Sequence, residues 1–266
     1  MNRIVDFHTH AFPPAIARQA LGALTEKAGG LLPQTDGTVD GLLRHMDEAG
    51  VSHGVVLCIA TNPKQQKSVN DFAASIPNER LTAFGSVHPF APDAMEELDR
   101  LHALGIRGIK LHPQYQGFAV DDERVFPLYA KMAALGMPVV FHAGVDIGFP
   151  APYLCEPEAL ARALPAFSGS AVVAAHMGGY MRWDEVEKHL VGQPVYLDTA
   201  YCYSRIATLP AKRMIENHGP QNVLFGSDCP WARMEDEIRF VRSLGLEPWA
   251  EEAILGKNAE RLLGLA

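Results

Sequence analysis

Six of the eleven histidines lie at or just past the end of an apolar run in the sequence. Asp228 ends another such run in the same way. If the runs are neighbouring parallel strands, these side chains meet at one end of the fold, and imidazole with carboxylate suits Zn²⁺ and other first-row divalent ions. The six histidines are His8, His10, His88, His112, His142 and His176, whereas the other five lie in helical patterns or before a strand, where we expect surface or packing roles.

The pair His8 and His10 is the most specific part of this pattern. It stands in Asp6-Phe7-His8-Thr9-His10, directly after an apolar run. The two-residue alternation of a strand places both imidazoles on the same side, so both can reach one ion. Each of the other strand-end residues, taken alone, is more typical of a hydrogen-bonded strand end than of a metal ligand. Together with the pair, they indicate a metal site.

Eight apolar runs, separated by amphipathic stretches, must position these side chains. Near-continuous hydrophobicity is typical of parallel strands covered on both faces. Eight βα units in 266 residues predict a single α/β domain over 1–266 with the (β/α)8 TIM-barrel architecture. A doubly wound sheet is the weaker alternative, because no GxGxxG follows the first run. The runs are Ile4–Phe7, Gly54–Ile59, Leu81–Val87, Ile106–Leu111, Pro138–Phe141, Ala171–Ala175, Val195–Leu197 and Asn222–Phe225.

Helices are expected between the runs. The clearest follows Thr38, a capping residue, and ends at Gly50, with apolar residues repeating at helical spacing between them. The others are Ala94–Leu104, Glu123–Leu135, Trp183–Leu190, Ile206–Asn217 and Met234–Leu244. Two segments are longer than ordinary connections: Ala11–Gly37, which we expect to form a lid-like insertion over the barrel mouth, and Ala143–Pro157, a candidate mobile loop.

Composition excludes several classes of partner. The formal charge of −8 and the lack of a Lys/Arg run disfavour a nucleic-acid surface. No apolar stretch is long enough to span a bilayer, and the N-terminal residues lack the pattern of a secretory signal. The four dispersed cysteines are typical of a cytoplasmic protein with reduced thiols. We therefore expect a small-molecule substrate, with no nucleic acid and no membrane, and leave a homo-oligomer open.

Several phrases of the chain resemble the amidohydrolase superfamily, and in particular the amidohydrolase-related family that includes aminocarboxymuconate semialdehyde decarboxylase. The resemblance covers essentially the whole chain. It implies that His8, His10, His142 and Asp228 bind a divalent metal, zinc first and manganese second, in a mononuclear site. It also implies that His176 acts on the substrate or on water at the metal. The phrases are Asp6–His10, Gly105–Pro113, Phe141–Gly144, Ala175–Gly179, Leu197–Thr199, Leu224–Pro230 and Ile254–Leu263.

Lys110 admits more than one interpretation. In binuclear members of the superfamily a lysine on the fourth strand is carbamylated and bridges two metals. The phrase Ile109-Lys110-Leu111-His112-Pro113 resembles the mononuclear branch better. Lys110 and His112 are therefore predicted to bind a substrate carboxylate, and an ion pair inside the barrel is an equally good interpretation of Lys110.

The leading functional hypothesis is a metal-dependent hydrolase. Water activated by the metal and by the catalytic base Asp228 would attack an amide, lactone or ester of a small carboxylated substrate, with His176 as the second catalytic group. Non-oxidative decarboxylation is the alternative. The decarboxylases of this family are somewhat longer than 266 residues, which slightly favours hydrolysis. A TatD-like nuclease is disfavoured by the Lys-Leu-His phrase, and a non-catalytic ligand-binding barrel by the complete set of ligand residues.

Overall fold

The computed structural model describes residues 3–76 and 79–265, which form an α/β fold of short parallel strands alternating with helices. Each strand of this described part coincides largely with one of the eight predicted runs, so the strand prediction is confirmed. The strands are β1 (Val5–Thr9), β2 (His53–Leu57), β3 (Leu81–Phe84), β4 (Ile109–Leu111), β5 (Val139–Phe141), β6 (Val172–Ala174), β7 (Tyr196–Asp198) and β8 (Val223–Leu224).

The chain divides into two compact units. Unit 1 holds the chain up to Val56, a short stretch that ends at Thr82, and the chain from Leu197 onward. Unit 2 holds the rest, which lies between Leu57 and Tyr196. The prediction of a single domain stays a prediction.

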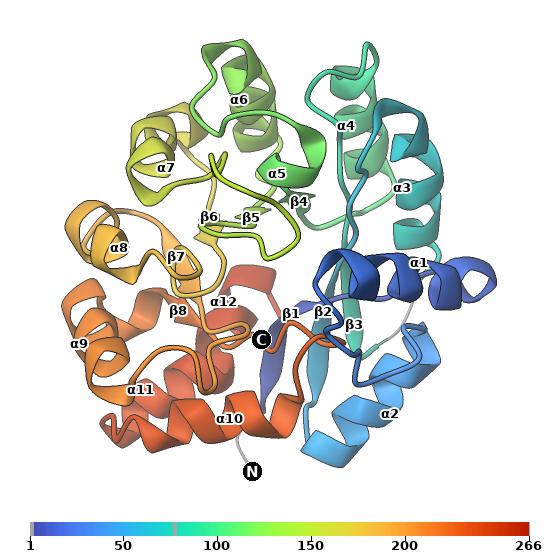
Figure 1. The fold of residues 1–266 in the computed structure, drawn as a ribbon. Coiled ribbons are helices and arrows are strands. Elements are labelled where there is room, and N and C mark those ends of the chain that lie inside the picture. The colour runs from blue at the N-terminus through green and yellow to red at the C-terminus, as the bar shows by residue number, and fades with distance from the viewer. Residues whose placement is uncertain (1–2, 77–78, 266) are drawn as a thin grey trace. The chain divides into compact units, whose positions relative to one another are not determined.

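In unit 1 the first and last strands of the chain are neighbours. The amide of Phe7 in β1 donates to the carbonyl of Phe225, which follows β8, and β8 pairs in parallel with β7. On its other side β1 pairs in parallel with β2. The helices of this unit are α1 (Pro14–Lys27), α2 (Val39–Ala49), α9 (Thr208–His218), α10 (Met234–Ser243), α11 (Pro248–Glu252) and α12 (Asn258–Leu263), and a π-helical turn, Ala253–Lys257, links the last two (Figure 1).

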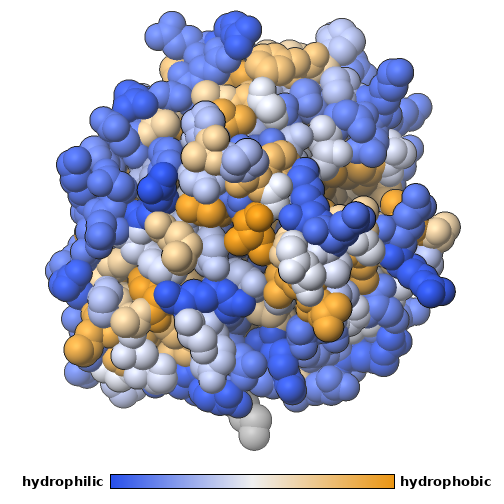
Figure 2. All heavy atoms as spheres, viewed as in Figure 1, coloured by the Kyte–Doolittle hydropathy of each residue, from blue (hydrophilic) through white to orange (hydrophobic). Residues whose placement is uncertain are grey.

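In unit 2 the strands β4, β5 and β6 pair in parallel without a break in register, so residues such as Lys110, Val140 and Val173 lie side by side. All three strands are buried, as their apolar sequences predict. The surface over α7 and α8 is mostly hydrophilic (Figure 2), as expected of amphipathic helices that turn their polar faces to solvent. The helices of this unit are α3 (Gln66–Ala74), α4 (Ala94–Ala103), α5 (Pro113–Gln116), α6 (Phe126–Ala134), α7 (Pro157–Ala163) and α8 (Trp183–His189).

Capping chemistry sets the ends of α2 and the start of the segment after Asp122. The hydroxyl of Thr38 accepts a hydrogen bond from the amide of Gly41, and Gly50 ends α2 in the left-handed conformation, as predicted. The predicted helix from Glu123 begins instead as a 3-10 turn, because the carboxylate of Asp122 accepts from the amide of Arg124 two residues on. No helix among residues 3–76 and 79–265 is long and apolar enough to cross a membrane.

The predicted insertion Ala11–Gly37 contains α1 and a return segment. The amide of Phe12 donates to the carbonyl of Gly37, which closes the segment on itself. The amide of Gln34 donates to the carbonyl of Pro230, beyond the carboxyl end of β8. The return segment therefore docks on the end of unit 1 where Asp228 lies, and its action as a lid stays a prediction.

Candidate metal centre

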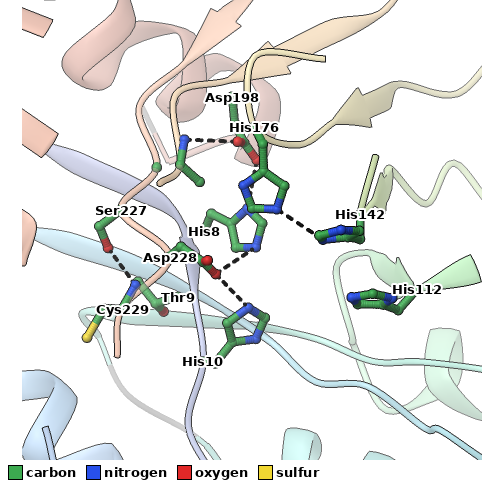
Figure 3. Close-up of polar contacts among 12 residues, drawn as sticks. His8, Thr9, His10, His112, His142, His176, Asp198, Ser227, Asp228 and Cys229 are labelled. Atoms are coloured by element: carbon green, nitrogen blue, oxygen red, sulfur yellow. Dashed lines mark hydrogen bonds and ion pairs between the residues drawn. The ribbon is translucent and has the colours of Figure 1, made fainter. Parts of the chain in front are cut away.

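Three of the predicted ligands meet in unit 1. Oδ1 of Asp228 lies 3.2 Å from Nε2 of His10 and 3.5 Å from Nε2 of His8 (Figure 3). The two imidazole rings face this carboxylate from the end of β1, with their centroids 5.2 Å apart. Both rings thus face the same carboxylate oxygen, and their role as ligands of one metal ion stays a prediction.

Asp198, at the end of β7, fixes the orientation of His8. Its Oδ2 lies 2.8 Å from Nδ1 of His8, and both side chains are fully buried. With the Nδ1 proton donated to this carboxylate, Nε2 of His8 presents its lone pair toward Asp228. Such a carboxylate behind a histidine is common at metal sites, where it fixes the tautomer of the ligand and raises its basicity.

The backbone of Asp228 is held in a strained conformation. Its φ of 69° lies in the left-handed region, which residues with a side chain adopt rarely. The amide of Asp228 donates to the carbonyl of His8, and its own carbonyl accepts from the amide of Trp231. Because strain of about 1–3 kcal/mol persists only where the surroundings impose it, these bonds indicate that the direction of the carboxylate matters.

Asp6 links β1 to the segment that carries Asp228. Its Oδ1 accepts hydrogen bonds from the amides of His8 and Ser227. Burial raises the pKa of Asp6 to about 7, against which the Ser227 and His8 hydrogen bonds act. The side chain thus stabilises the approach of two segments that lie 221 residues apart in the sequence.

The donor set of unit 1 fits a first-row divalent ion. The ligand atoms of His8, His10 and Asp228 all lie within 4.8 Å of one another. Metal–ligand bonds of about 2.0–2.2 Å in a tetrahedron place ligand atoms about 3.3 Å apart. The distances of 3.2 and 3.5 Å to Asp228 agree with that separation. Two imidazoles and one carboxylate can therefore hold such an ion and leave a position for water or substrate.

Unit 2 holds a second group of polar side chains. The rings of His112 and His142 stack with centroids 4.2 Å apart, and Oδ2 of Asp146 lies 3.2 Å from Nε2 of His112. Nε2 of His176 lies 3.1 Å from Nδ1 of His142 (Figure 3). Nε2 of His142 lies 3.3 Å from the carbonyl oxygen of Val145. The ligand atoms of His112, His142 and Asp146 also lie within 4.8 Å of one another.

Electrostatics keep His142 uncharged. Burial lowers its pKa well below the ordinary value, and the neighbouring His112 and His176 lower it further. The charge of Lys110, a fully buried residue of β4, acts in the same direction. A neutral imidazole is the form that binds a metal, so the environment of His142 suits the predicted role as a ligand.

The predicted residues therefore divide between the units. His8, His10 and Asp228 come together in unit 1, and His112, His142 and His176 come together in unit 2. Both ring nitrogens of His112 have protein partners, since Nδ1 accepts from the amide of Tyr115 and Nε2 faces Asp146. This arrangement gives His112 a structural role beside the predicted contact with substrate. Its ring orders α5 and the loop of Asp146.

Sequence reasoning missed Asp146. It lies in the predicted loop Ala143–Pro157, and its Oδ1 accepts from the amide of Gly148 while its Oδ2 faces His112. The only signal in the sequence is an acidic residue four positions after His142. His88, named as a strand-end histidine, accepts at Nδ1 from the amide of Phe90, and burial lowers its pKa, which matches a structural hydrogen bond.

Comparison with known proteins identifies the family. The family model described as amidohydrolase matches residues 5–265, so the chain belongs to the amidohydrolase family. The chain is accordingly an enzyme of the amidohydrolase superfamily, as the resemblance predicted. A search of curated protein sequences found no significant match.

Solved structures show the same fold. An uncharacterized TIM-barrel protein from Bordetella bronchiseptica is 23% identical, with 98% of each chain covered and a TM-score of 0.78. A dihydroxybenzoic acid decarboxylase from Polaromonas sp. JS666, solved with bound manganese and the inhibitor 2-nitroresorcinol, is 16% identical, with 100% of this chain and 98% of that chain covered and a TM-score of 0.70. A putative 2-pyrone-4,6-dicarboxylic acid hydrolase from Pseudomonas putida is 16% identical, with 99% and 98% covered and a TM-score of 0.67. The chain thus has the α/β fold of TIM barrels, as predicted.

Proposed function

We propose that this member of the amidohydrolase family is a metal-dependent hydrolase that cleaves an amide, lactone or ester bond of a small carboxylated molecule. The observation that carries the proposal is the position of Asp228, whose Oδ1 faces Nε2 of both His8 and His10. A carboxylate placed among metal-ligating imidazoles can bind the ion with one oxygen and accept a proton from water with the other.

The proposed roles follow from this position. His8, His10 and Asp228 would hold a zinc or manganese ion, which when bound would polarise the scissile carbonyl and lower the pKa of water toward about 7. Asp228 accepts the proton of the attacking water. Asp198 keeps Nδ1 of His8 protonated, so that Nε2 stays available as a ligand.

The residues of unit 2 keep the roles predicted from the sequence. His142 is proposed as the third imidazole ligand, and His176 as the group that delivers a proton to the leaving group. The uncharged state of His142 and its 3.1 Å approach to His176 support both roles. Lys110, a buried lysine of β4 whose charge acts on His142, is proposed to bind a carboxylate of the substrate.

Non-oxidative decarboxylation is the second candidate, and one specific observation favours it. The fold of this chain matches 98% of the length of the dihydroxybenzoic acid decarboxylase from Polaromonas. The argument that this chain is shorter than the decarboxylases of the family therefore gives only weak support to hydrolysis. In this reaction the same residues would bind a carboxylated substrate, and a proton would replace CO₂ on carbon.

Metal content and product analysis test the proposal together. The purified enzyme, supplied with zinc or manganese, is analysed by plasma mass spectrometry and then given lactones, amides, esters and aromatic carboxylates. Hydrolysis products and released CO₂ are both measured in the same samples. Metal in the enzyme with hydrolysis supports the proposal, CO₂ release without hydrolysis selects decarboxylation, and activity without metal overturns both.

Variants assign the ligands. His8→Ala and His142→Ala are expected to lose the metal, while His102→Ala, an exposed histidine of α4, serves as the matched control. Asp228→Asn is expected to lose turnover and weaken metal binding without collapsing the site, because asparagine tolerates the left-handed backbone at this position. A His142→Ala enzyme that keeps its full metal content would remove His142 from the ligand set.

A further inference from the structure

The segment between β5 and α7 carries a carboxyl group that is nearly buried. Asp146 lies in this segment, residues 143–156, which we call the β5 loop. Its side chain is only 10% exposed, although most acidic side chains in loops are open to water. Burying a carboxyl group costs free energy unless partners satisfy its oxygen atoms. The partners of Asp146 therefore indicate what this side chain does.

Backbone hydrogen bonds fix the position of Asp146. The amide of Val145, the residue before it, donates to the carbonyl of Tyr180. The amide of Phe149, three residues after it, donates to the backbone carbonyl of Asp146. The amide of Gly148 donates to Oδ1 of its side chain at 2.7 Å. These bonds hold the backbone and one carboxyl oxygen, so the other oxygen, Oδ2, has a defined direction.

Oδ2 of Asp146 faces two stacked imidazole rings. It lies 3.2 Å from Nε2 of His112 and 3.9 Å from Nε2 of His142. The planes of the two rings are 9° apart, and they lie one above the other in Figure 3. Nδ1 of His112 accepts from the amide of Tyr115, so the neutral ring carries its proton on Nε2, toward Oδ2. His112 thus orients the carboxylate beside His142.

Two oxygen atoms of the β5 loop lie close to Nε2 of His142. One is Oδ2 of Asp146, and the other is the carbonyl oxygen of Val145 at 3.3 Å. Nδ1 of the same ring lies 3.1 Å from Nε2 of His176. A neutral imidazole has one proton for its two nitrogens, so donation from Nδ1 to His176 leaves Nε2 able to bind an ion. Imidazole nitrogen and carboxylate oxygen are both ligands of first-row divalent ions.

We propose that Asp146 is a ligand of the metal ion that His142 binds. The proposal rests on the proposed function, in which His142 is a metal ligand, and adds a carboxylate that the sequence analysis did not name. Two metal–ligand bonds of about 2.2 Å span at most about 4.4 Å. The 3.9 Å between Oδ2 of Asp146 and Nε2 of His142 lies within that span, so one ion can contact both atoms.

A chelator competition with zinc on the full-length protein tests the proposal. Asp146→Asn keeps an oxygen that accepts from Gly148 but removes the negative charge. It should weaken zinc binding about 10-fold or more, because even residues that only support a ligand contribute that much. His142→Ala should weaken binding as well. Asp121→Asn is the matched control, since it removes a carboxylate of unit 2 that pairs with Arg162, and it should bind zinc as the wild type does.

The absorption spectrum of the cobalt-loaded proteins separates ligation from an indirect effect of the loop. The visible bands of Co²⁺ depend on the number and geometry of its ligands, so Asp146→Asn should change them and Asp121→Asn should not.

Wild-type zinc affinity in Asp146→Asn, or weaker binding with a wild-type cobalt spectrum, would overturn the proposal. If His142→Ala still loses affinity in that case, the proposed function stands and only the role of Asp146 fails. If His142→Ala also binds zinc as the wild type does, the ligand set of the proposed function fails with it.

Discussion

Glu237→Gln should change how the stability of this enzyme depends on pH. Burial raises the pKa of Glu237 from 4.5 to about 8, so between these values the folded state keeps a proton that the unfolded chain releases. Unfolding then releases protons, and the free energy of unfolding falls as pH rises. The contribution of Glu237 is therefore fully present below pH 4.5 and is lost as pH rises through about 8.

The magnitude follows from the same shift. A difference of 3.5 pKa units, from 4.5 to about 8, corresponds to about 5 kcal/mol when the group is fully ionised. Across two pH units inside this window, from about 5.5 to 7.5, the loss is about 3 kcal/mol. Glutamine keeps the oxygen that accepts from Cys202 and Tyr203 but does not titrate. Its amide also lacks a buried acceptor, which adds a pH-independent cost of about 1–3 kcal/mol.

Urea unfolding of both proteins across pH 5 to 8.5, at equal metal loading, measures the effect. The wild type should be the more stable protein at pH 5.5, and the two curves should converge or cross as pH rises. Other titrating groups are common to both proteins and cancel in the difference. Parallel curves would refute the reasoning, because they would mean that Glu237 is already ionised in the folded state and neutralises Arg205.

Three further changes test the site. Asp198→Ala frees Nδ1 of His8 from its carboxylate and should weaken metal binding about 10- to 100-fold in a chelator competition, whereas unchanged affinity would show that Asp198 does not orient the ligand. His176→Asn should keep the metal and lose about 10²-fold or more in turnover; a metal-free variant would place His176 among the ligands. Gly144→Ala should lower the melting temperature, because its Cβ would lie 2.4 Å from the amide nitrogen of Tyr180 at a φ of 81°, and an unchanged temperature would mean that the loop relaxes without cost.

The sequence predicted the strands well because their signal is local. A run such as 138–141 is apolar enough to be recognised as a buried strand wherever it packs, and β5 lies within it. The same reasoning located His8, His10 and Asp228, since each follows such a run. Their convergence in unit 1 needed only the rule that ligands in these folds gather at the carboxyl ends of parallel strands.

Residues whose roles depend on distant partners were not predictable in this way. Glu237 is one charged residue among several in the amphipathic helix α10, and only the structure shows that its carboxyl group accepts from the amides of Cys202 and Tyr203 after β7. Asp146 lies in a loop without periodicity and becomes significant through its approach to His112. The strained φ of Asp228 likewise has no sequence signal, because aspartate adopts many backbone conformations.

The cluster of His8, His10 and Asp228 in unit 1 is a product of the contact between the first and last strands. The amide of Asp228 donates to the carbonyl of His8, and the amide of His10 donates to the carbonyl of Cys229, so one pair of backbone bonds sets the distance between both ligand segments. Bringing together two segments so far apart in the sequence costs conformational entropy. This cost is offset only when the strands dock. The ligand set of this unit therefore exists only in the folded chain, and a divalent ion that prefers it must also stabilise the docking of β8 beside β1.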